Sequence, residues 1–275
     1  MQMGQIVYSL RIKMYYNILS LIQIDATDKL WPEWSLFQCS AISNCDLQID
    51  IVSHNQLKYG LEILGEQPGN AVLQYANCLL CVNSNWSKAK LTVFNSQTVG
   101  ISKLLNALLF THLSVKGTLE MHASLVERGG KGILFLGPSG IGKTTQAELW
   151  REYRGAEIIN GDRVFLKQKA RKFLGCGSPW HGSSSYCLNK QVPIYGIIIL
   201  KQSINNLIRR LTGFEMISGL MNSVFLPSWY IEGYKAACDT LDALLRTVPV
   251  YELSCRPDED AVRLTEETIF GKRMI

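Results

Sequence analysis

The chain has 275 residues, of which 47% are hydrophobic and 19% charged, and its net charge at neutral pH is +5. This length and composition predict a globular protein with room for two domains. The positive charge is mild and no basic block alternates with aromatic residues, so we expect no nucleic-acid-binding function. The longest apolar runs fall far short of the ~20 residues of a membrane-spanning helix, so we expect no membrane insertion.

The eight cysteines are too dilute in a chain of this length to form a disulfide scaffold. We therefore expect mostly free thiols and a reducing, cytoplasmic location. Cys78 and Cys81 have C-x-x-C spacing, but they lie in an apolar run without a second pair or a histidine at zinc spacing. This context favours core thiols. Residues 1–24 contain no small-residue cleavage site, so we do not expect a secretion signal.

Residues 1–97 predict a small β-rich accessory domain. Tyr15–Ile24 is rich in β-forming residues and indicates a first strand, which a polar turn separates from a loop at residues 31–34. Further short strands are expected at Leu47–Val52, Tyr59–Leu64, Ala71–Asn77, Cys78–Val82 and Ala89–Phe94. No residue spacing in this domain indicates chemistry.

Residues 98–275 form the second predicted domain. Its first element, Thr98–Leu113, has apolar residues at helical spacing. We expect a strand at Thr118–Val126, then a glycine-rich turn and a short buried strand at residues 132–136. A helix is expected at Gln146–Tyr153. The buried strand and this helix flank a glycine-rich loop.

That loop matches the phosphate-binding pattern G-x-x-x-x-G-K-[ST] at every fixed position. It comprises Gly137, Pro138, Ser139, Gly140, Ile141, Gly142, Lys143 and Thr144, and Thr145 follows it as a further cofactor-binding candidate. Backbone N–H groups of such a loop converge on phosphate oxygens, Lys143 would reach the β- and γ-phosphates, and the Thr144 hydroxyl would ligate Mg²⁺. Because strand, loop and helix occur in the required order, we predict that this domain binds ATP and Mg²⁺.

The remainder of the chain is expected to contain both strands and helices. The predicted elements are a strand at Gly155–Asn160, a hairpin of Val164–Leu166 with Arg171–Leu174, a strand pair of Ile194–Leu200 with Leu207–Leu211, a helix at Gly213–Val224, and helices at Ala236–Leu245 and Glu259–Phe270 on either side of a Pro249–Leu253 strand. These elements predict an α/β (α+β) fold class.

Two residues outside the loop are candidates for chemistry. Asp162 follows a strand, where it could accept the proton of an acceptor hydroxyl or ligate a metal ion. The sequence leaves both roles open, beside that of a turn-capping residue. His122 lies on the strand that precedes the nucleotide-binding strand. A lone histidine is more often an ordinary sheet residue, and only this position makes His122 a candidate.

These residues resemble the catalytic domain of HPr kinase/phosphorylase, a family with a phosphoenolpyruvate-carboxykinase-like fold. The resemblance covers about residues 115–225. It rests on His122, the phosphate loop, and Gly161-Asp162-Arg163-Val164 in place of the family's Asp-Asp-x-Val element. The resemblance implies a P-loop kinase in which His122 is an active-site residue and Asp162 takes the proton of a seryl hydroxyl.

The resemblance also implies roles for other residues. Lys143 would bind the phosphates and Thr144 would bind Mg²⁺, with Asp162 as a second candidate metal ligand. A later arginine is catalytic in the family, and Arg209 or Arg210 is the nearest counterpart in this chain. The family forms hexamers, which implies a possible homo-oligomer.

The sequence departs from the family in three places. Gly161 replaces the first acidic residue of the family's element, Thr145 stands where the family has Glu, and the glutamate-containing metal-binding loop is not recognisable. In place of that loop, residues 175–182 resemble the Gly-Thr/Ser-Pro-Trp segment of divergent relatives. These relatives include kinases that phosphorylate a serine of lasso-peptide precursors.

Three residues of this segment, Ser178, Trp180 and His181, are candidates for binding the acceptor. Trp180 and His181 could equally pack the segment against the sheet. The residues that are kept suffice for transfer from ATP, whereas phosphorolysis of a phosphoserine needs elements that are missing. We therefore expect a kinase without the reverse activity.

The sequence as a whole predicts a Mg·ATP-dependent kinase that phosphorylates a serine on a peptide or small protein, with a lasso-type precursor peptide as the first expectation. Two alternatives remain open. One is a kinase of a small metabolite, because no residue excludes a small alcohol as acceptor. The other is a nucleotide-dependent regulatory module that has no acceptor site.

Overall fold

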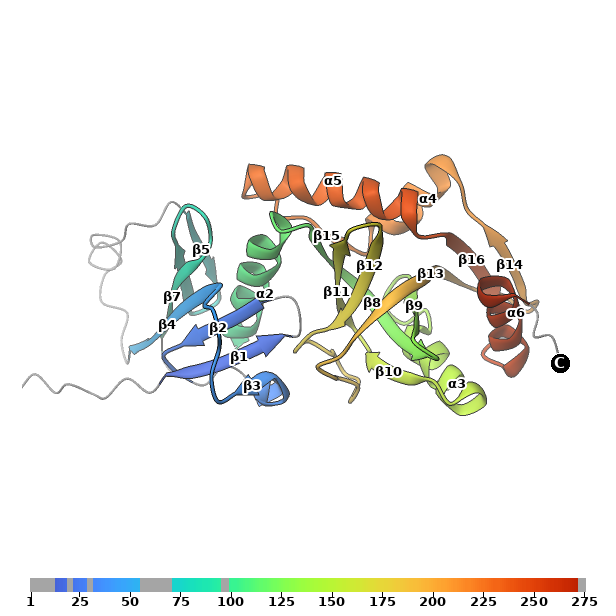
Figure 1. The fold of residues 1–275 in the computed structure, drawn as a ribbon, viewed down its shortest axis with the longest axis horizontal. Helices are drawn as coiled ribbons and strands as arrows, with labels where there is room; N and C mark the ends of the chain where they lie inside the picture. Colours follow the sequence, from blue (N-terminus) through green and yellow to red (C-terminus); the bar gives the residue numbers. More distant parts are fainter. Residues whose placement is uncertain (1–12, 19–21, 29–31, 55–70, 95–98, 272–275) are drawn as a thin grey trace, which may run out of the picture. The chain divides into compact units, whose positions relative to one another are not determined.

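The computed structural model describes residues 13–18, 22–28, 32–54, 71–94 and 99–271. The chain divides into two compact units, one of Met1–Asn17 with Ile22–Asn106 and one of Ile18–Leu21 with Ala107–Ile275. Each unit has its own β-sheet, and helices join the strands of the second unit, so the α/β class is confirmed (Figure 1). No helix within the described ranges is long and apolar enough to cross a membrane.

The N-terminal unit contains a seven-stranded sheet in the order β3-β1-β2-β4-β7-β6-β5. Its strands are β1 (Met14–Ile18), β2 (Ile22–Ala26), β3 (Gln38–Cys39), β4 (Leu47–His54), β5 (Ala71–Tyr75), β6 (Cys78–Val82) and β7 (Lys88–Phe94). Strands β2, β4 and β7 run parallel, while β7, β6 and β5 form an antiparallel series. The β-rich character of this unit is confirmed, and the predicted strand at Tyr59–Leu64 lies outside the described residues.

Two local predictions for this unit are wrong. Tyr15–Ile24, expected to form one strand, contains parts of both β1 and β2. The loop predicted at residues 31–34 overlaps a 3-10 helix, Pro32–Phe37. Trp34 is buried in this helix, and its ring meets the ring of Tyr16 edge-on at 5.7 Å. Contacts between aromatic rings distant in sequence order this segment, and local turn residues do not reveal them.

All eight cysteines lie in the described part of the chain and are free thiols, as expected. Cys78 and Cys81 are buried on β6, and burial raises the pKa of both thiols. Within the described ranges, no three His, Cys, Asp or Glu side chains gather as ligands for a metal ion. The C-x-x-C pair is therefore part of the core.

The C-terminal unit contains a nine-stranded sheet and most of the helices. Its strands are β8 (Thr118–Arg128), β9 (Lys131–Leu136), β10 (Glu157–Asn160), β11 (Arg163–Lys169), β12 (Lys172–Gly177), β13 (Gln191–Gln202), β14 (Leu207–Arg210), β15 (Val224–Phe225) and β16 (Val250–Cys255). The helices are α2 (Val99–Ser114), within which the boundary between the units falls, α3 (Lys143–Arg154), α4 (Gly213–Met221), α5 (Ile231–Thr247) and α6 (Glu259–Phe270).

The centre of this sheet is parallel. Strand β13 pairs in parallel with β9 on one side and β16 on the other, while β8 runs antiparallel to β9. The predicted pairing of Ile194–Leu200 with Leu207–Leu211 is therefore wrong, because β16 lies between β13 and β14. Ile197 and Ile198 are both fully buried, as expected for a strand with packed faces on both sides. Strand β14 is mostly exposed and suits the edge.

Helices cover both faces of the central strands. On one face, Ile197 belongs to a core cluster that includes Leu241 and Leu244 of α5. On the other face, Ile198 belongs to a cluster that includes Trp150 of α3 and buried residues of α6. Helix α4 ends at Met221, three residues before the predicted end, and β15 then pairs with β8. Strands β8 and β9 thus lie between two packed layers.

Candidate active site

The glycine-rich loop joins β9 to α3, which confirms the predicted order of strand, loop and helix. Gly140 and Gly142 have φ angles of 78° and 110°, which side chains other than glycine rarely adopt. A Cβ atom added at Gly140 would meet no atom within 4 Å. The loop therefore has an open, concave backbone surface, which fits the phosphate groups of a nucleotide.

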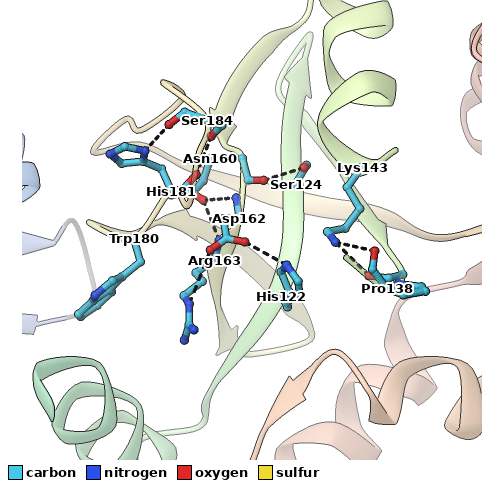
Figure 2. Close-up of polar contacts among 12 residues, drawn as sticks. His122, Ser124, Pro138, Lys143, Asn160, Asp162, Arg163, Trp180, His181 and Ser184 are labelled. Carbon is cyan, nitrogen blue, oxygen red and sulfur yellow. Dashed lines mark hydrogen bonds and ion pairs between the residues drawn. The ribbon is translucent and has the colours of Figure 1, made fainter. Parts of the chain in front are cut away.

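Lys143 begins α3 and is only 7% exposed. Its Nζ donates hydrogen bonds to the carbonyl oxygens of Gly137, at 3.0 Å, and Pro138, at 3.2 Å (Figure 2). Burial lowers the pKa of Lys143, and the negative charge of Asp162 partly opposes this. The loop thus holds its cation next to the open glycines, as a phosphate-binding loop requires.

His122 of β8 and Asp162, in the turn between β10 and β11, point toward each other, with His122 Nε2 3.0 Å from Asp162 Oδ1 (Figure 2). Burial alone would raise the pKa of Asp162. The hydrogen bond from His122 and the positive charges of His122, Arg163 and Lys143 outweigh burial and lower this pKa. Asp162 is therefore an ionised carboxylate at neutral pH, and its charge and that of Lys143 act on each other.

Thr144 and Asp162 are the two candidate ligands of the predicted Mg²⁺. Mg²⁺ in kinases is held by one or two protein oxygens together with phosphate oxygens and water, so it needs no three-residue cluster. Thr144 is half-buried in the first turn of α3, directly after Lys143, and fits such a ligand. Asp162 fits less well, because its two oxygens already face His122 at 3.0 Å and Arg163 at 3.7 Å.

Asn160 positions Asp162 and was not identified from the sequence. It is fully buried, and its Oδ1 accepts hydrogen bonds from the backbone N–H groups of Asp162 and Arg163, both at 2.9 Å. Its Nδ2 donates to the carbonyl oxygen of Ser178 at 2.9 Å. An Asn side chain that bonds the backbone two residues on is a recognised turn signal, so the Asn-Gly-Asp order could have revealed it.

Arg163 is a second residue that sequence reasoning missed. Its guanidinium bonds Oε1 of the buried Glu120 at 3.0 Å, and it lies over the ring of Phe225 at 4.4 Å. In the β8–β11 pairing, Arg163 is directly opposite His122. Glu120 and His122 are two residues apart on one strand, and therefore point to the same face. Once the pairing is known, these charged side chains must meet.

Arg209 and Arg210 lie on the edge strand β14 rather than with this cluster. The guanidinium of Arg209 forms ion pairs with Glu215 and Glu252, at 2.9 and 3.0 Å. Arg210 is exposed, opposite Tyr251 of β16. The arginine that the structure brings to His122 and Asp162 is Arg163.

The segment after β12 packs directly onto Gly161 and Asp162. A Cβ atom added at Gly161 would lie 2.7 Å from Cβ of Ser184 and nearer still to its hydroxyl. A Cβ atom added at Gly182 would lie 2.9 Å from the carboxyl carbon of Asp162. This segment therefore leaves no room for a side chain at Gly161, the position that corresponds to an acidic residue in the family that the sequence resembles.

Ser178 anchors this segment. It is fully buried, and its hydroxyl donates to the carbonyl oxygen of Arg163 at 2.8 Å and accepts from the backbone N–H of Trp180 at 3.2 Å. Trp180 and His181 are half-buried. Figure 2 shows the side chains of Trp180 and Arg163 extending in the same direction, while the His181 ring turns to the carbonyl oxygen of Ser184, which its Nδ1 contacts. Of the three candidates, Ser178 holds the segment in place by hydrogen bonds with neighbouring backbone groups, while Trp180 extends away from the segment (Figure 2).

Comparison with known proteins finds similarity to solved structures but none to a family model or a curated sequence. Among solved structures, the HPr(Ser) kinase/phosphatase from Coxiella burnetii is similar to this chain at a TM-score of 0.32 and 17% identity. The similarity covers 54% of this chain and 97% of that one. A similarity at this level carries no conclusion about activity, so the function of this chain is inferred from the geometry of its own site.

Proposed function

We propose that this protein is an ATP-dependent kinase that transfers a phosphoryl group to a hydroxyl group. One observation carries the proposal: Ala123 of β8 pairs with Leu136, directly before the phosphate loop, and donates its N–H to the carbonyl oxygen of Asp162 at 2.9 Å, so one strand joins the loop to this carboxylate. Phosphoryl transfer needs a phosphate cradle next to a group that orients or deprotonates the acceptor. The C-terminal unit provides both.

Each residue has a distinct role in the proposed reaction. The loop backbone and Lys143 bind and orient the phosphates of ATP. Asp162 accepts the proton of the acceptor hydroxyl as its oxygen bonds to the γ-phosphorus and the bond between that phosphorus and the bridging oxygen of ADP breaks. His122 and Arg163 hold the carboxylate in place from two sides. Mg²⁺, held by Thr144 and the phosphates, would neutralise charge on the phosphate oxygens.

We propose a serine of a peptide or small protein as the acceptor, with a precursor peptide of lasso type as the first candidate. Two features support a peptide. The segment from Ser178 to Ser184 packs against Asp162, so an acceptor at this carboxylate would lie beside the segment. Trp180 extends from this segment, and an aromatic ring offers a large contact area to a flexible chain at little entropic cost.

The direct test is to incubate the full chain with Mg·ATP and two sets of acceptors, serine-containing precursor peptides and small alcohols such as sugars. We expect a mass gain of one phosphate on a peptide serine. The Asp162→Asn variant should lose it, whereas Asp239→Asn, which changes an exposed carboxylate on α5, should keep it. Phosphorylation of a sugar and of no peptide would show that the acceptor is a small metabolite instead of a peptide. ATP turnover that no acceptor stimulates would favour a regulatory module.

A further inference from the structure

A pocket of about 560 Å³ adjoins the phosphate loop. One wall comes from the loop and the first turn of α3, at residues 140–142, 145 and 146. The others come from the ends of two strands, at residues 200–204 after β13 and 255–257 after β16. Both strands run parallel to β9, so their C-terminal ends meet at the edge from which the loop emerges. α/β sheets commonly bind ligands outside this edge.

We propose that this pocket binds the nucleoside part of the nucleotide and selects a purine that carries an exocyclic amino group. The proposal rests on the nucleotide binding in the proposed function and adds the base that is recognised and the residues that recognise it. It concerns a different wall of the site from the acceptor side around Asp162.

Continuity with the loop is the first argument. Gly140, Gly142 and Thr145 belong to the phosphate loop or follow it directly, and they also line the pocket. A Cβ atom added at Gly140 would meet nothing within 4 Å, so the loop is open at a residue that also lines the pocket. A ligand whose phosphates contact the loop can therefore extend its remaining part into the pocket. A volume of this size is typical of sites for small organic ligands.

The chemistry of the walls suits a flat, uncharged ring. Ile141 and Leu200 provide apolar surface, and Ile204 on the rim is 81% exposed. A base that enters the pocket would cover part of that apolar side chain. Burial and the charge of Asp258 raise the pKa of Cys255 to about 11, so its thiol is neutral. This side of the pocket thus carries no negative charge that would repel a nucleotide.

Gln146 supplies the selectivity. Its side chain lines the pocket and is 3% exposed, and its Nε2 donates to Sγ of Cys255 at 3.3 Å. Its Oε1 is buried and has no hydrogen-bond partner among the described residues. A buried amide oxygen without a donor is unfavourable, and native structures usually satisfy it. The exocyclic amine of adenine or guanine is a donor of the required kind, whereas hypoxanthine lacks this amine.

The test measures binding of Mg·ATP, Mg·ITP and inorganic tripolyphosphate to the full chain by calorimetry. We expect ATP to bind at least about tenfold more tightly than tripolyphosphate, because only ATP fills the pocket. Ser203→Trp should fill the pocket with a ring and reduce the affinity for ATP by about tenfold or more, while the affinity for tripolyphosphate should change by less than about twofold. Asn205→Trp places the same ring on a neighbouring exposed residue that does not line the pocket, and should change neither.

A second variant tests the base. The wild type should prefer ATP to ITP by about tenfold, and Gln146→Leu should reduce this preference to about one, because it removes the acceptor. The proposal that the pocket binds the nucleoside would be wrong if Ser203→Trp bound ATP as tightly as the wild type does. It would also be wrong if this variant lost affinity for ATP and for tripolyphosphate equally. Equal binding of ATP and tripolyphosphate to the wild type would overturn it as well and leave the kinase proposal standing. If neither ligand binds the wild type, the nucleotide-binding function itself fails.

Discussion

Gly161 and Ser184 are in such close contact that a methyl group at position 161 would lie 2.7 Å from Cβ of Ser184. The contact presses the segment from Ser178 to Ser184 onto the turn that carries Asp162. Gly161, one of three places where the sequence departs from the family that it resembles, is therefore a packing position.

We expect Gly161→Ala to destabilise the protein by about 1–3 kcal/mol, because overpacking a closed contact forces the backbone apart. Chemical denaturation measures the loss. Ser184→Gly removes the colliding atoms, so Gly161→Ala combined with Ser184→Gly should regain most of the stability that the alanine costs. If the double variant loses the sum of the two single effects, the two residues do not interact as described.

Lys143→Ala should reduce ATP-dependent phosphorylation by about 100-fold or more, since it removes the cation that stabilises charge on the phosphates. Lys172→Ala, which changes an exposed lysine on β12, is the matched control and should keep full activity. Circular dichroism checks that both variants are folded. Activity of Lys143→Ala within about threefold of the wild type would contradict the kinase assignment.

Asp162→Asn should abolish transfer while Mg·ATP binding, measured by calorimetry, falls only modestly. Arg163 lies 3.7 Å from one oxygen of Asp162, and its positive charge would repel a metal ion there, whereas an acceptor hydroxyl needs only one free lone pair of the carboxylate. Joint loss of nucleotide binding and activity would show that Asp162 mainly holds the metal ion.

The pH dependence of kcat/KM tests the partner of Asp162. Because the pKa of Asp162 is lowered, the active carboxylate persists to acidic pH. The same shift stabilises the fold: this contribution is present above the unfolded pKa of about 3.9 and is lost as the pH falls through the lower folded pKa. His122→Ala removes the interaction that lowers this pKa most, while burial still raises it. The acidic limb of the profile should therefore move to higher pH, and His122→Gln, which keeps a donor, should move it less.

Arg163→Ala should lower kcat by about tenfold or more with little change in the affinity for ATP, because Arg163 orients the acceptor side rather than the phosphates. It should also destabilise the fold by about 3 kcal/mol, since the buried carboxylate of Glu120 loses its ion-pair partner. Adding Glu120→Gln removes that charge and should restore part of the stability but not kcat. Arg171→Ala, an exposed arginine on the neighbouring turn, is the control.

The reverse reaction should be absent. We expect a phosphoserine peptide incubated with orthophosphate to release no pyrophosphate, because, by the resemblance to the bifunctional family, Gly161, Thr145 and residues 175–182 stand in place of elements that phosphorolysis needs. Mass spectrometry and a pyrophosphate assay follow the two products. Trp180→Ala should raise KM for a peptide acceptor more than it lowers kcat, as expected for a residue that binds rather than reacts. Pyrophosphate release would overturn the prediction.

The sequence by itself determined the phosphate loop, because eight consecutive residues specify its conformation through glycine φ angles and the adjoining strand and helix are local patterns. It also identified His122 and Asp162 as candidates from their place before and after that loop. Most strands of the C-terminal unit were found for the same reason, since apolar runs and turns are short-range signals.

Only the tertiary structure decided which residues surround Asp162. Arg163 and Glu120 join it through the register of β8 against β11. Strand β16, which begins at Val250, enters between β13 and β14, although β14 already ends at Arg210. Core packing on the two faces of the sheet sets such registers, and no local propensity encodes them. The collision that requires Gly161 likewise exists only once the segment containing Ser184 has folded back onto it.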